Sequence, residues 1–66
     1  MERKEMSGDE TWACADFLYR VHEMVCCAGM KEADLDDAGM LLDLGMILLE
    51  ASFELEDLAW EKGVMA

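Results

Sequence analysis

The sequence predicts an all-α protein, an antiparallel two-helix hairpin that pairs with a second copy in a homodimeric four-helix arrangement. Two stretches repeat apolar residues at three- and four-residue spacing, and helix-capping signals stand at the ends of each. Only a few residues separate them, which favours antiparallel neighbours. Of the 66 residues, 55% are hydrophobic and none is proline, which is more apolar side chain than one small hairpin buries. We therefore expect a single domain over residues 1–66 that oligomerises.

The first helix is predicted over about residues 8–28. Ser7 followed by Glu10 fits a capping box, in which each side chain accepts a hydrogen bond from the backbone N–H of the other residue. Gly29 is expected to end the helix, because glycine adopts left-handed backbone angles at the least cost. Residues 1–6 are charged, lack helical periodicity and are predicted to be disordered.

Two apolar stripes run along this first helix and predict two neighbours for it. The wider stripe, which we expect to form the core, consists of Cys14, Phe17, Leu18, Val21, Met24, Val25 and Ala28. The thinner stripe follows heptad spacing through Trp12, Tyr19 and Cys26, with Ala15 and His22 between them. The expected oligomer interface joins this thinner stripe to the second helix and consists of Trp12, Tyr19, Cys26, Leu42 and Leu49.

The second helix is predicted over about residues 35–62. Asp34 is the expected N-cap, and Gly63 follows the last turn as the expected C-terminal glycine. Residues 38–53 are too apolar for a surface helix, since leucine, isoleucine, methionine and phenylalanine occupy most of its circumference. This helix therefore needs apolar partners on more than one side.

Two glycines, Gly39 and Gly45, lie inside the second helix, where each costs about 1 kcal/mol relative to alanine. They could kink or break the helix, or they could let another helix approach closely. Neither is flanked by proline or by a polar cluster, so we expect a continuous helix. Leu41, Leu48 and Leu55 are expected to lie in its core.

The net charge of −11 is concentrated in the second half of the chain. Residues 1–31 hold four basic and six acidic side chains, whereas residues 32–66 hold one basic and ten acidic side chains. Without clustered lysine and arginine, we expect no direct binding to nucleic acid or to an anionic membrane surface. A bilayer-spanning helix is also not expected, because Asp43 and Glu50 interrupt an apolar run that is already shorter than about 20 residues.

The cysteines indicate a reduced, cytoplasmic protein. Cys14, Cys26 and Cys27 are an odd number, and the N-terminus has no apolar signal segment. Cys26 and Cys27 point about 100° apart on a helix, which disfavours a mutual disulfide. His22 and Cys26 have the i,i+4 spacing of two metal ligands, but a lone histidine on an apolar stripe is more often packed and hydrogen-bonded. We expect neither a metal nor a cofactor.

The strongest pattern outside the core is an acidic stripe on the second helix. Four of its members recur every seven residues and two more fill the same side, which gives Asp36, Asp43, Glu50, Glu54, Asp57 and Glu61. A solvated helix face normally mixes both signs of charge, but no lysine or arginine occurs between Lys31 and Lys62. The unrelieved repulsion favours a row of carboxylates that binds basic groups of a partner, and a merely solvated face is the alternative.

No motif indicates catalysis, since no cysteine has both a base and an orienting group and no glycine-rich phosphate loop is present. We therefore expect a non-enzyme. The leading hypothesis is a small inhibitor or adaptor whose acidic stripe occupies a basic nucleic-acid-binding site on a partner protein. The analogy is with phage and mobile-element proteins that block nucleases or CRISPR complexes. The alternative is a structural or regulatory dimerisation module that binds through apolar helix faces, and a metal-binding or redox protein comes third.

Overall fold

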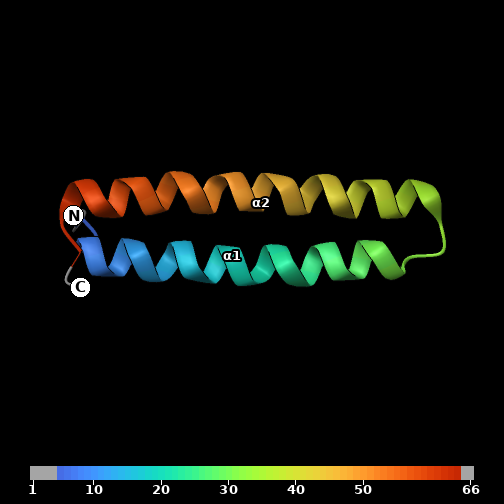
Figure 1. Ribbon diagram of the computed structural model, residues 1–66, viewed down its shortest axis with the longest axis horizontal. Helices are drawn as coiled ribbons and strands as arrows, with labels where there is room; N and C mark the ends of the chain where they lie inside the picture. The colour runs from blue at the N-terminus through green and yellow to red at the C-terminus, as the bar shows by residue number, and fades with distance from the viewer. Residues whose placement is uncertain (1–4, 65–66) are drawn as a thin grey trace, which may run out of the picture.

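The computed structural model describes residues 5–64 and shows two antiparallel helices side by side (Figure 1). Helix α1 spans Gly8–Lys31 and helix α2 spans Leu35–Lys62. The chain reverses at one end of the hairpin, and the start of α1 and the end of α2 lie together at the other (Figure 1). The described residues contain no strand, so the prediction of an all-α hairpin is confirmed. Residues 1–4 of the segment predicted to be disordered lie outside the described residues.

Both predicted N-caps are confirmed. The Ser7 hydroxyl accepts a hydrogen bond from the Glu10 backbone N–H at 3.1 Å, and the Ser7 N–H donates to the Glu10 carboxylate at 3.3 Å. The Asp34 carboxylate accepts from the backbone N–H groups of Asp36 and Asp37 at 2.9 and 3.1 Å. Each helix start thus satisfies donors that have no partner within the helix.

The predicted end of α1 is wrong by three residues. The helix continues past Ala28 to Lys31, and Gly29 is a buried residue inside it. A Cβ built on Gly29 would lie 3.2 Å from Leu41 Cβ and 3.1 Å from Leu42 Cγ, tighter than ordinary contact. Gly29 therefore serves the close approach of α2. Gly63, by contrast, follows α2 as predicted and has a left-handed φ of 93°.

Helix α2 is continuous through both of its glycines, as predicted. A Cβ on Gly45 would overlap the sulfur of Cys26 on α1, so glycine is what allows the two helices to meet at this level. No atom lies near the corresponding position of Gly39, which faces open space. Only one of the two glycines is therefore needed for packing.

The seam between the helices repeats every seven residues on both of them, with alternating steps of three and four. Every position of the seam is buried or half-buried. Its members on α1 are Gly8, Thr11, Ala15, Leu18, His22, Val25 and Gly29, and its members on α2 are Ala38, Leu41, Gly45, Leu48, Ser52, Leu55 and Ala59. The prediction that Leu41, Leu48 and Leu55 face the core is confirmed, although each is only half-buried.

Small side chains occupy every second seam position of α2, so the helices pack closely. Two of the buried seam residues are polar, and each satisfies its hydroxyl on its own helix. The Thr11 hydroxyl donates to the Ser7 carbonyl at 2.8 Å, and the Ser52 hydroxyl donates to the Leu49 carbonyl at 2.6 Å. The narrow seam therefore carries polar residues without burying an unpaired polar group.

The predicted core stripe of α1 is only partly correct. Leu18, Val21 and Val25 are half-buried, whereas Cys14 and Ala28 are exposed. Phe17 and Met24 are also exposed, by 65% and 70%. The seam runs between the two predicted stripes, because closely packed helices meet along their small residues and leave the large side chains at the flanks. Much of the apolar surface of the hairpin is consequently uncovered.

Replacing Leu48 with alanine is expected to cost about 2 kcal/mol, the lower end of the range for buried leucine, because Leu48 is half-buried in the seam. Leu35, which is 86% exposed, is the matched control and should cost less than about 0.5 kcal/mol on the same change. Urea unfolding followed by circular dichroism, at one fixed protein concentration, measures both. An equal loss of unfolding free energy at the two positions would contradict the placement of Leu48 in the seam.

Candidate protein-binding surfaces

The acidic stripe lies on the outer side of α2, away from the seam. All six of its side chains are exposed: Asp36, Asp43, Glu50, Glu54, Asp57 and Glu61. None of them has an ion-pair partner within residues 5–64. Carboxylates two helical turns apart stand about 10 Å from each other, so they form an extended negative row. The structure thus leaves this row open to solvent or to a partner.

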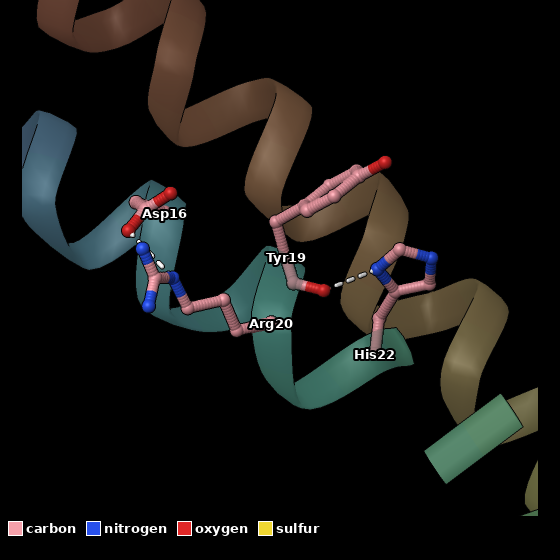
Figure 2. A network of polar contacts seen from close by, with 4 residues as sticks. All are labelled: Asp16, Tyr19, Arg20 and His22. Carbon is pink, nitrogen blue, oxygen red and sulfur yellow. Dashed lines mark hydrogen bonds and ion pairs between the residues drawn. The ribbon is translucent and has the colours of Figure 1, made fainter. Parts of the chain in front are cut away.

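The basic side chains of the described residues are placed elsewhere. Arg20 pairs with Asp16 one turn earlier on α1, at 3.0 Å and at the surface (Figure 2). Lys62 donates a hydrogen bond to the Met6 carbonyl at 3.0 Å, which ties the two ends of the hairpin together. Lys31 is in the last turn of α1. The charge of the acidic stripe is therefore largely uncompensated along the middle of α2.

Aromatic side chains from both helices gather on one side of the seam. The rings of Trp12 and Trp60 meet edge to face, with centroids 5.7 Å apart and planes at 76°. Helical periodicity adds other apolar residues to this side. We call this surface the aromatic face, and its members are Trp12, Tyr19, Leu42, Leu49, Phe53 and Trp60.

A shallow groove of about 280 Å³ opens on the aromatic face, above the seam. Residues from both helices line it: Trp12, Ala15, Asp16, Tyr19, Ser52, Phe53 and Glu56. Its floor consists of the small seam residues Ala15 and Ser52, and its walls are aromatic. The three aromatic walls, Trp12, Tyr19 and Phe53, are exposed by 37%, 42% and 51%. The groove exists because small seam residues stand between large neighbours.

The opposite side of the seam carries a second apolar surface. Its members are Phe17, Val21, Met24, Met40, Leu44 and Ile47. All of them are exposed except Val21, which is half-buried. On this side the nearest charged residues of α2 are Asp37 and Glu54, at the two ends. We call it the charge-poor face, because no charge interrupts its centre.

The predicted oligomer contacts remain available to another chain in four of five cases. Trp12, Tyr19 and Leu42 are exposed and Leu49 is half-buried, all on the aromatic face. Cys26 differs, because its sulfur lies against Gly45 within the hairpin. A role for the other four in oligomerisation stays a prediction.

The proposed metal pair, His22 and Cys26, is engaged in local contacts. The Nδ1 atom of His22 lies 2.5 Å from the Tyr19 carbonyl oxygen, to which its N–H donates, and the two rings meet edge to face at 4.6 Å (Figure 2). Within residues 5–64, no three histidine, cysteine or acidic side chains stand close enough to hold one ion. Cys14 and Cys27 are exposed free thiols and lie outside this pair. His22 and Cys26 therefore pack within the hairpin through these local contacts.

Neither helix, within residues 5–64, combines the length and the apolar character needed to cross a bilayer. Comparison with protein-family models, with curated proteins and with solved structures gave no match. The function must therefore be argued from the surfaces themselves.

Proposed function

We propose that this protein is a non-enzymatic protein-binding module that pairs as a homodimer and presents its acidic stripe to a basic surface of another protein. The observation that carries the proposal is the uncompensated row of exposed carboxylates on α2. Apart from Asp36, which lies in the first turn of α2, these like charges repel one another and do not stabilise the helix, so their value lies in contact with a cationic partner. The charge-poor face supplies the surface for pairing.

A basic nucleic-acid-binding site is the partner surface that this row fits best. Such sites place lysine and arginine along an extended groove to meet successive phosphates. Carboxylates spaced along a rigid helix compete for the same side chains, and the net charge of −11 accelerates the encounter with a basic protein. The module would then act as an inhibitor or adaptor of a nucleic-acid-binding protein, of the kind that phages and mobile elements encode.

The second candidate is a structural or regulatory dimerisation module. The observation that favours it is the large exposed apolar surface, which includes Phe17, Met24 and Ile47 on one face and Phe53 and Trp60 on the other. Surfaces of this kind mark protein contacts, and aromatic residues dominate their energetics. In this case the apolar faces bind the partner and the acidic stripe only keeps the assembly soluble.

The test of the leading proposal neutralises four carboxylates of the acidic stripe, through Asp43→Asn, Glu50→Gln, Glu54→Gln and Asp57→Asn. We expect the helices to persist or to gain slightly in stability, because like-charge repulsion is relieved. Displacement of DNA from a panel of nucleases with basic grooves measures binding at about 50 mM and about 300 mM salt. The parent should displace DNA from at least one nuclease, steeply less at high salt, and the variant should do so at least about tenfold more weakly.

The matched control removes four charges away from the acidic stripe, through Glu5→Gln, Glu23→Gln, Glu32→Gln and Asp37→Asn. Its net charge equals that of the test variant, so a difference between the two reports the position of the charge. Binding that persists in high salt and in the four-amide variant would support the dimerisation module instead. A panel in which the parent displaces no DNA would contradict the nucleic-acid-site proposal.

A further inference from the structure

We infer that the groove on the aromatic face binds an arginine side chain of the partner protein. The inference deepens the proposed function and rests on it, because it gives the basic partner a second, specific point of attachment. Three aromatic side chains and two carboxylates line the groove, a combination suited to a planar cation. The site belongs to the aromatic face and is separate from the acidic stripe.

The aromatic walls supply the first half of the recognition. Trp12 and Tyr19 come from α1, and Phe53 comes from α2. Their π-faces carry partial negative charge, which attracts a cation placed over the ring. A guanidinium group is also flat and weakly hydrated, so it stacks on aromatic rings more readily than an ammonium group does. These walls therefore favour arginine over lysine.

The carboxylates supply the second half. Asp16 is already paired with Arg20 at 3.0 Å, whereas Glu56 is half-buried and has no ion-pair partner within residues 5–64. A carboxylate beside aromatic rings is less well solvated than one in open water, so a cation gains more from it. Glu56 is the group that would accept hydrogen bonds from a guanidinium in the groove.

The size and setting of the groove point to a side chain and not to a free metabolite. Its volume of about 280 Å³ is at the lower limit of the roughly 300–1,000 Å³ typical of small-molecule sites, and the groove is shallow, whereas such sites enclose most of their ligand. It also continues into the exposed surface of Phe53 and Trp60, against which a protein backbone can pack. Within residues 5–64 a second copy of this chain is a poor donor, because the arginine there, Arg20, is paired with Asp16.

The test uses two short peptides, acetyl-Gly-Arg-Gly-amide and its citrulline counterpart, which is neutral and nearly the same shape. Each is titrated into isotope-labelled protein, and backbone amide shifts are followed by NMR. We expect the arginine peptide to shift the signals of Trp12, Tyr19, Phe53 and Glu56, and the citrulline peptide to bind at least about fivefold more weakly. A lysine peptide should fall between the two.

Two substitutions and two matched controls define the site. Glu56→Gln and Tyr19→Leu should each weaken arginine binding by about fivefold. Glu32→Gln removes the same charge at the other end of the hairpin, outside both the groove and the acidic stripe, and Phe17→Leu makes the aromatic-to-leucine change on the charge-poor face. Both controls should bind as the parent does. Equal effects of Glu32→Gln and Glu56→Gln, or equal binding of the citrulline peptide, would overturn the inference.

The same titration separates failure of this inference from failure of the proposed function. If arginine shifts only the signals of Asp43, Glu50 and Asp57, the groove is not the site but the acidic stripe still recruits cations. Shifts confined to the groove, in a protein that displaces no DNA from nucleases, would support the groove and contradict the nucleic-acid-site proposal. Stronger binding of tetramethylammonium than of the arginine peptide would replace arginine with a quaternary amine and overturn the assignment.

Discussion

Replacing Gly45 with leucine is expected to cost about 3 kcal/mol, the upper part of the range for overpacking, which is enough to unfold most of a marginally stable small domain. The reason is the close approach of the helices at this level. Even a single Cβ on Gly45 overlaps the sulfur of Cys26, and the Cys26 backbone nitrogen is 3.6 Å away. The thiol can rotate away from a methyl group, but a leucine side chain has to displace helix α1 itself. Thermal unfolding should show Tm lowered by roughly 12–24 °C.

The same substitution at Gly39 is the control. Gly39 lies in the same helix, is exposed and would meet no atom with an added Cβ. Leucine there should stabilise the hairpin by up to about 1 kcal/mol, because it is a better helix former than glycine. The two variants have the same composition and should move Tm in opposite directions. A Gly45→Leu variant as stable as the parent would show that the helices do not meet closely at this point.

Local signals in the sequence were enough to predict both helices and three of their four ends. Ser7, Asp34 and Gly63 act through backbone groups within one turn of themselves, so their effect needs no knowledge of the partner helix. The fourth end was predicted at Ala28 because Gly29, like Gly63, is a glycine that directly follows a stretch with helical periodicity. Gly29 instead serves packing against Leu41 and Leu42, a tertiary contact that no capping pattern contains.

The small residues of the seam were missed because the prediction took the wider apolar stripe of the first helix as the core. The signal that would have found it is the column of small residues at every seventh position of the second helix, Ala38, Gly45, Ser52 and Ala59. Each of these small residues except the last is followed three positions later by a leucine, and these leucines, which include Leu48, were correctly predicted to lie in the core. Two columns at heptad spacing, one small and one large, define a closely packed antiparallel pair. Phe17 and Met24 were assigned to the core because they fall on the wider apolar stripe of the first helix.

The groove could not be predicted from the sequence, whereas the acidic stripe could. The stripe belongs to one helix, so its periodicity is visible in the chain. The groove joins Trp12 and Tyr19 to Phe53 and Glu56, which meet only when the register of the two helices is known. That register follows from the small residues of the seam. If Ala15 and Ser52 are taken as heptad positions that face each other, the sequence predicts that the same aromatic side chains lie close together.

Replacing Leu44 with glutamate is expected to split the proposed homodimer into monomers. Leu44 lies near the centre of the charge-poor face and is 46% exposed in the single hairpin. A carboxylate there leaves the hairpin intact but, in a two-fold interface, places an unpaired charge in the apolar contact from each copy. The dimer should weaken by at least about 100-fold, or about 2.7 kcal/mol. Light scattering at micromolar concentration measures the assembly, and circular dichroism checks that the helices persist.

Leu42→Glu is the matched control, because it makes the same change two residues away on the aromatic face, where Leu42 is 38% exposed. Its dimer should persist. If Leu42→Glu splits the dimer and Leu44→Glu does not, the copies pair through the aromatic face, and the interface predicted from the sequence for Trp12, Tyr19 and Leu49 is supported. A parent protein that is monomeric at micromolar concentration would contradict pairing through either face, and the uncovered apolar surface would then belong to a different partner.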